Sequence, residues 1–146
     1  MKTYWWLISL LWTGCNQQPE AIRYGQDACA HCRMIIADEK FGSELITQKG
    51  KIYKFDSIEC LAAYLNQFSE KDIHSMWITD FKNPGQWVRA DQAQFLQSSN
   101  VPSPMGMFLS GYSNAHDAHS MQKQFDGDVL NWQQVMTRVQ SRHANQ

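Results

Sequence analysis

The sequence predicts an α+β fold, in which two related small ββαβ units pack together after a signal and lipobox segment. The run Ile52-Tyr53-Lys54-Phe55 alternates apolar and polar residues as a half-buried strand does, and short extended segments are expected in both halves of the chain. Each half also has a helix between its strands, near residues 58–68 and 114–125. A sulfur-bearing loop, an extended segment, a helix and another strand therefore follow in similar order twice.

In the first half, a helix is expected between strands. Asp56 and Ser57 are N-cap residues, and the apolar residues Ile58, Leu61 and Leu65 then recur at helical spacing. Lys49-Gly50-Lys51 is a tight turn, and Asn83-Pro84-Gly85 ends a later strand. The expected elements are strands at 33–37, 42–48, 52–55, 75–79 and 87–90, and a helix from about 58 to 68.

The second half is expected to begin with a proline-bounded loop and to end in a polar helix. Ser113 is a suitable cap for a helix, and Asp126-Gly127-Asp128 breaks it. The expected elements are a turn or short helix at 93–96, a loop at 101–107, an apolar stretch at 108–110, a helix at 114–125, a strand at 129–130 and a helix at 132–140.

The N-terminus has the features of an export signal. Lys2 supplies a positive charge, Tyr4 to Trp12 form an apolar core, and small residues lead to Cys15. The position of Cys15 resembles a bacterial lipobox, although Trp12 stands where lipoboxes usually have Leu. Cleavage by ordinary signal peptidase near Cys15 is the alternative. We divide the chain into a signal peptide (1–14), a lipidated Cys with a polar tether (15–27), and one domain (28–146) whose units meet near residue 98.

The segment after Cys15 predicts the compartment. Asn16 rather than Asp follows the cysteine, which favours the outer membrane over the inner membrane for a lipoprotein that faces the periplasm.

A net charge of −1 with 18% charged residues gives no basic field for nucleic acid. The sequence also contains no Ser/His/Asp arrangement, no paired carboxylates and no phosphate-binding glycine loop, so we expect a binding protein rather than an enzyme.

The segment Cys29-Ala30-His31-Cys32-Arg33-Met34 carries the main chemical signal. Thiolate and thioether together favour Cu(I), because thioether sulfur is a soft ligand that zinc sites rarely use. On an extended strand, Cys32 and Met34 point to the same face. Cys29 is a further thiolate ligand, a disulfide partner of Cys32, or a bystander. His31 is expected to face away from the site.

Other candidate ligands lie further along the chain. Met105 and Met107 flank Gly106 in a loop that is a poor place for core packing, so either is a candidate, with Met107 favoured. His116 and His119 lie one helical turn apart and could bind a divalent metal, or they could line a solvated helix face. We keep His116 as an auxiliary ligand. Cys60 is interpreted as a structural thiol.

Two other functions compete with copper binding. A periplasmic thiol-disulfide oxidoreductase would use Cys29 and Cys32, but such a motif normally begins a helix, and here it leads into an apparent strand. A structural zinc site would combine Cys29 and Cys32 with His116 and His119, which leaves Met34 without a role.

Several segments resemble the NosL family, exported copper-binding lipoproteins of nitrous oxide reductase gene clusters. They are Cys15, the run Cys29-x-x-Cys32-x-Met34-x-Ile36-x-Asp38, the run from Tyr53 to Cys60, Trp77 to Phe81, Trp87-Val88-x-Ala90 and Pro104-Met105-Gly106, all in the family's order. Many members have Gly where this chain has Arg33.

The resemblance implies a fold of two related units and a role in denitrification. It implies Cu(I) delivery to apo nitrous oxide reductase or another copper enzyme, with an ABC-type membrane complex as partner. It also implies ligation by Cys32 and Met34, with a third ligand from the second half. Such a third ligand could equally come from a second molecule, so a homodimer is a further possibility.

Overall fold

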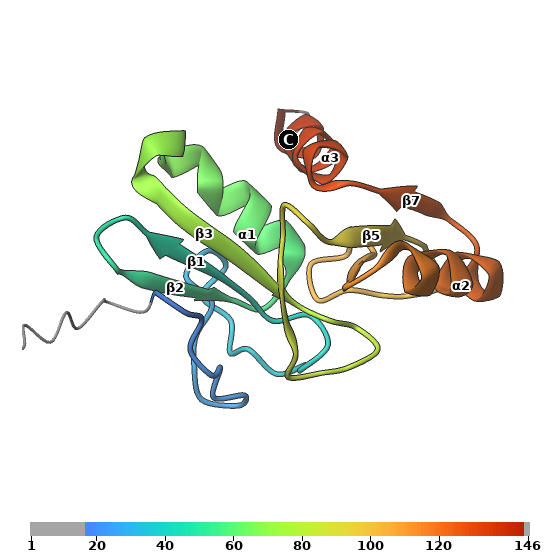
Figure 1. The fold of residues 1–146 in the computed structure, drawn as a ribbon, viewed down its shortest axis with the longest axis horizontal. Helices are drawn as coiled ribbons and strands as arrows, with labels where there is room; N and C mark the ends of the chain where they lie inside the picture. The colour runs from blue at the N-terminus through green and yellow to red at the C-terminus, as the bar shows by residue number, and fades with distance from the viewer. Residues whose placement is uncertain (1–16, 145–146) are drawn as a thin grey trace, which may run out of the picture.

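The computed structural model describes residues 17–144, in which two small antiparallel sheets are combined with three α-helices (Figure 1). The predicted signal peptide and the lipid-bearing Cys15 lie outside the described residues. None of the described helices is long and apolar enough to cross a membrane.

The first unit is a four-stranded sheet with one helix. Its strands are β1 (Ser43–Thr47), β2 (Ile52–Phe55), β3 (Ile73–Thr79) and β4 (Trp87–Arg89), in the order β2-β1-β3-β4. The helix α1 (Ile58–Tyr64) connects β2 to β3. Short 3₁₀ turns at Leu65–Gln67 and Glu70–Asp72 complete this connection.

The second unit is a three-stranded sheet with two helices. Its strands are β5 (Gln94–Gln97), β6 (Leu109–Tyr112) and β7 (Asp128–Leu130), in the order β6-β5-β7. The helix α2 (Ala115–Phe125) connects β6 to β7, and α3 (Trp132–Ala144) follows β7.

Both units have the same topology, which confirms the predicted fold class. In each unit the first strand is central, because it pairs on one side with the next strand and on the other with the strand after the helix. The second sheet begins with β5, a few residues before the predicted boundary near residue 98.

Two predicted elements were wrong. The segment 33–37 is not a strand, and only an isolated bridge between Ala28 and Ile35 forms there. The physical reason is Arg33, whose φ of 68° is left-handed and interrupts an extended run. The segment predicted as a turn or short helix at 93–96 forms β5 instead, because both of its edges are paired in the second sheet.

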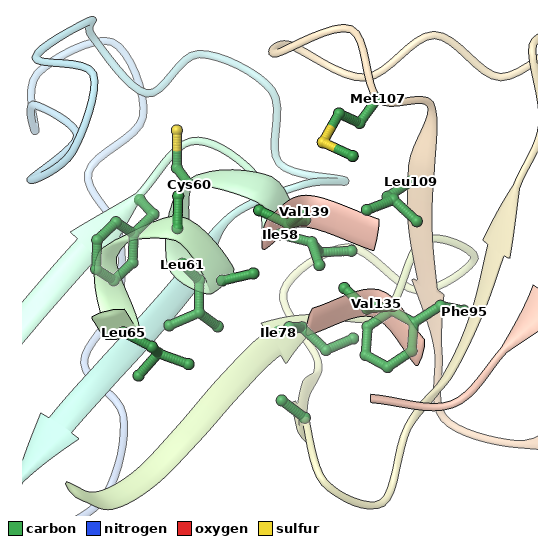
Figure 2. Close-up of a cluster of buried hydrophobic side chains, with 14 of the residues drawn as sticks. Ile58, Cys60, Leu61, Leu65, Ile78, Phe95, Met107, Leu109, Val135 and Val139 are labelled. Carbon is green, nitrogen blue, oxygen red and sulfur yellow. The ribbon is translucent and has the colours of Figure 1, made fainter. Parts of the chain in front are cut away.

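A single apolar core joins the two units (Figure 2). Buried side chains from α1 and β3 meet buried side chains from the second sheet and α3, and the main contributors are Ile58, Leu61, Ile78, Phe95, Leu109, Val135 and Val139. In Figure 1, α3 lies beside α1, and the two helices contact each other. A smaller cluster of Leu96, Tyr112, Ala118 and Met121 fixes α2 to the other face of the second sheet.

The two sheets approach closely at Gly111 in β6. A Cβ at this position would lie 2.3 Å from Cδ1 of Ile78 in β3, so no larger residue fits without displacing that side chain. The Phe81 amide also donates to the Gly111 carbonyl at 2.8 Å. The contact between units therefore depends on a glycine as well as on the apolar core.

Residues 17–27, which we call the strap, run along the first sheet. The Glu20 amide donates to Oε2 of buried Glu44 at 2.9 Å. Lys54 Nζ donates to the Ala21 carbonyl at 3.1 Å and to Asp27 at 3.0 Å. The described part of the predicted tether is therefore packed against the domain.

Candidate metal centre

The loop at Cys29 is a tight turn tied to the edge of the first sheet. The Arg33 amide donates to the Cys29 carbonyl at 3.0 Å, and the Cys29 amide donates to the Met34 carbonyl at 2.8 Å. The Ala30 amide donates to the Lys54 carbonyl of β2 at 2.8 Å. These bonds hold the two thiols of the Cys-x-x-Cys motif beside the end of β2.

The start of α1 supplies the rest of the site. Asp56 follows β2 directly, and Ser57 is the N-cap of α1. Its side chain accepts a hydrogen bond from the Cys60 amide at 3.2 Å, which satisfies a free donor of the first turn. The cap therefore holds Cys60 in the first turn of α1.

These two segments bring four potential ligands together. One ligand atom from each of Cys29, Cys32, Asp56 and Cys60 lies within 4.8 Å of the others. We call this group the thiol cluster. Cys29 and Cys60 are each 1% exposed, and Cys32 is only partly buried. The Cys32 thiol donates to Oδ1 of Asp56 at 3.6 Å.

The surroundings shift the pKa values of the three thiols in different directions. The hydrogen bond from the Cys60 thiol lowers the pKa of Cys29. Burial opposes this effect, and the backbone amides of His31, Cys32 and Asp56 reinforce it. The same bond raises the pKa of Cys60, and burial raises the pKa of Cys32. Cys29 is therefore the thiol most ready to form a thiolate, which is the metal-binding form.

A cavity of about 120 Å³ lies beside Cys60, between the two units. We call it the Met pocket, and it is lined by His31, Glu59, Cys60, Met105, Met107, Arg142 and His143. The Arg142 side chain donates to the Gly106 carbonyl at 3.0 Å, so the end of α3 closes one side. Figure 2 shows the sulfur atoms of Cys60 and Met107 at the same margin of the core.

The structure gathers some predicted site residues and separates others. Cys29 and Cys32 lie in the thiol cluster, and Met105 and Met107 line the Met pocket. His31 lines this pocket too, although the sequence placed it on the opposite face from Cys32. His116 and His119 are exposed on α2 and belong to neither site.

The expected shared face of Cys32 and Met34 was wrong, because the left-handed Arg33 between them prevents the strand geometry that it requires. Met34 is 55% exposed and does not line the Met pocket. Ligation by Met34 therefore stays a prediction.

The sequence reasoning missed Cys60 and Asp56 as members of the site. The sequence did contain a signal for both residues, because the N-cap residue Ser57 marks where the helix begins. Asp56 directly precedes this helix start, and Cys60 lies in the first turn of the helix. Both therefore lie at the end of the helix that a preceding loop can reach.

Comparison with known proteins decides the family. The family model of NosL matches residues 22–140, which include the thiol cluster, the Met pocket residues Met105 and Met107, and both sheets. This chain belongs to the NosL family. A search of curated proteins found no match.

A solved structure of the family has the same fold. The crystal structure of the copper chaperone NosL from Shewanella denitrificans superposes with a TM-score of 0.68 at 23% sequence identity. The match covers 79% of this chain and 92% of that chain. The two-unit architecture is therefore that of a NosL protein.

Proposed function

We propose that this NosL-family chain is a carrier, not an enzyme, that binds Cu(I) as cargo at the thiol cluster. Delivery to a copper enzyme follows, with apo nitrous oxide reductase as the proposed recipient. One observation carries the proposal: three thiols from two separate segments lie within 4.8 Å of one another around a buried carboxylate.

The donor set fits Cu(I). Thiolate and thioether sulfurs are soft ligands that select this ion. The cluster supplies Cys29, Cys32 and Cys60, and the Met pocket adds Met105 and Met107 on the other side of Cys60. A Cu(I) ion held by the thiols could exchange one of them for a thioether, which supports release as well as storage.

The unequal burial of the thiols supports a direction of transfer. Cys29 and Cys60 are almost fully buried, whereas Cys32 is partly exposed. A donor from a recipient protein would therefore reach the metal at Cys32 first and displace ligands one at a time. Asp56 accepts from the Cys32 thiol, so it is placed to receive the proton of that thiol when the metal binds.

The cellular setting is part of the proposal. A lipid on Cys15 would anchor the chain to the cell envelope facing the periplasm, with the outer membrane favoured by Asn16. The chain is packed on the first sheet from Gln17, whose side chain donates to the Gln48 carbonyl at 3.4 Å. Such an anchor would keep the domain at the periplasmic face of that membrane, and an ABC-type membrane complex is the proposed membrane partner. A homodimer is the remaining proposed assembly.

An anaerobic titration tests the binding step. Cu(I) is added to the reduced protein in competition with a chelator, for the wild type and for Cys29→Ser, Cys32→Ser and Cys60→Ser. We expect one Cu(I) per chain, and each Ser variant should bind about 100-fold more weakly, since each loses a thiolate ligand. Met34→Leu measures whether the exposed thioether contributes.

His116→Ala is the matched control, because His116 is exposed on α2 and outside the thiol cluster and the Met pocket. It should bind Cu(I) as tightly as the wild type. Weak Cu(I) binding that is insensitive to all three Ser substitutions would refute the proposal.

Zinc is the second candidate, and Asp56 is the observation that favours it. Three thiolates with one carboxylate match the four-coordinate tetrahedral preference of Zn²⁺. Asp56→Asn separates the two metals, because it should weaken Zn²⁺ binding and leave Cu(I) binding by the thiols nearly unchanged. The histidines His116 and His119 of the predicted zinc site lie on α2 and are not among the four clustered ligands.

The thiol-disulfide alternative receives less support. A lowered pKa at Cys29 suits a redox-active thiol, but this residue is 1% exposed. An attacking thiolate needs access to its substrate disulfide. Cys29 also lies in a turn rather than at the start of a helix.

A further inference from the structure

The exposed apolar surface of the described residues is concentrated next to the thiol cluster. Met34 is 55% exposed and Ile35 is 51% exposed, and these are the large hydrophobic side chains that the described part of the chain exposes. They lie two and three residues after Cys32, which is the thiol through which the cluster reaches the surface. Adjacent exposed hydrophobic residues at a site opening suggest a contact surface.

The backbone holds these side chains outward. Arg33 adopts a left-handed conformation with a φ of 68°, which is unfavourable for a residue with a side chain. Hydrogen bonds fix the residues on either side, since Met34 accepts from the Cys29 amide and buried Ile36 donates to the Asp27 carbonyl. The surface is therefore preformed in a closed, hydrogen-bonded turn.

Arg33 places an unpaired positive charge in this surface. Arg33 is exposed, and its guanidinium has no ion pair or hydrogen bond with any residue between 17 and 144. The side-chain carboxylate of Asp27, whose backbone accepts from Ile36, is bound by Arg23 and Lys54. A partner that covers Met34 and Ile35 would therefore gain from a carboxylate opposite Arg33.

We propose that Arg33, Met34 and Ile35 form the surface on which a copper-accepting protein docks, with an apolar rim and a carboxylate beside its own soft metal ligands. The inference rests on the proposed Cu(I) carrier function and names its partner surface. A second copy of this chain fits less well, because a two-fold contact centred here would bring two Arg33 side chains together. Docking at this turn would place the acceptor's ligands beside Cys32.

Copper transfer rates test this surface. The Cu(I)-loaded protein is mixed with apo nitrous oxide reductase, and separately with the small neutral chelator neocuproine. Ile35→Ser and Arg33→Glu should each slow transfer to the enzyme by about tenfold at low salt, because they remove apolar and electrostatic complementarity. In both variants, the Cu(I) affinity and the rate of copper transfer to neocuproine should stay within about twofold of the wild-type values.

The controls separate this inference from the function on which it rests. Lys123→Glu, a charge reversal on exposed α2, should transfer copper to the enzyme at the wild-type rate.

If the loaded wild type transfers copper and Ile35→Ser and Arg33→Glu transfer it equally fast, the proposed docking surface is refuted and the carrier function is not. A dimer in sedimentation velocity that Ile35→Ser dissociates would also overturn it. A wild type that binds no Cu(I) or passes none to the enzyme would overturn the carrier function and this inference together.

Discussion

The two units cap the start of a helix in the same way, but the residue that the cap holds has a different role in each unit. After β2, the Ser57 side chain caps α1 by accepting from the Cys60 amide, three residues later. After β6, the Asn114 side chain caps α2 by accepting from the Asp117 amide, also three residues later. In the first unit the residue held at this position is Cys60 of the thiol cluster. In the second unit it is a carboxylate that pairs with Lys82 at 2.6 Å.

The helices also differ in burial. All residues of α1 except Tyr64 are buried, because the first sheet, the second sheet and α3 surround it. Only Ala118 and Met121 of α2 are buried, and its histidines face solvent. The difference shows that topology alone does not create the site. The site requires a helix start that another segment covers, and the Cys29 loop covers only the first.

Core truncations should give the largest difference between the two helices. Leu61→Ala removes a fully buried side chain from α1 and should lower the free energy of unfolding by about 3 kcal/mol. Met121→Ala removes a side chain at the edge of the small α2 cluster and should cost roughly half as much. Urea unfolding measures both values. An equal or larger loss for Met121→Ala would contradict the view that α1 lies at the centre of the fold.

A buried carboxylate should give the first unit a pH dependence that the second lacks. Burial raises the pKa of Glu44 from 4.5 to about 7, with one oxygen bonded to the Glu20 amide and the other without a partner. The nearby Lys54 lowers this pKa, and Glu20 and Asp27 raise it. The folded state therefore keeps a proton that the unfolded chain releases between pH 4.5 and about 7.

Because of this proton, the free energy of unfolding should fall as the pH rises through that window, by on the order of 2 kcal/mol. Glu44→Gln should make this fall smaller without abolishing it, because burial also raises the pKa of Glu59, and the exposed Glu39→Gln should leave the fall unchanged. Denaturant unfolding at pH 5 and pH 8 measures the change. A Glu44→Gln variant that follows the wild-type profile would show that the strap does not bury this carboxylate.

The helix caps should give the smallest stability effect and the sharpest contrast in function. Ser57→Ala and Asn114→Ala should each cost about 1 kcal/mol, because each leaves a first-turn amide without its partner. Only Ser57→Ala should also weaken Cu(I) binding, by about threefold to tenfold, since Ser57 positions Cys60. Paired unfolding and Cu(I) titrations test both. Equal Cu(I) affinities in the two variants would mean that the cap does not position the site.

Local patterns predicted most of the fold. The strand at 52–55 and the helix start at Ile58 are visible because turn and cap residues border them. The β5 strand was missed because its two central residues are both apolar, so it does not alternate. Phe95 faces the core between the units, and Leu96 faces the α2 cluster. Only the packing of two separate clusters explains this pattern.

The candidate site was less predictable, because it joins segments distant in the chain. Cys29 and Cys32 are visible from their spacing, but the sequence does not reveal that Asp56 and Cys60 fold back onto them. Met34 was placed beside Cys32 on the assumption of a strand. Arg33 adopts a left-handed conformation where many family members have glycine, so the local propensity of the segment was misleading.

X-ray absorption at the copper edge of the Cu(I)-loaded protein counts the sulfur neighbours of the metal, so it shows whether the thiol cluster holds the ion. We expect sulfur-only coordination in the wild type. In Cys60→Ser we expect one sulfur neighbour fewer, or a thioether in its place at a longer distance. His116→Ala should give the wild-type spectrum. Nitrogen coordination that His116→Ala removes, or a spectrum unchanged in Cys60→Ser, would contradict a metal site built from the thiol cluster.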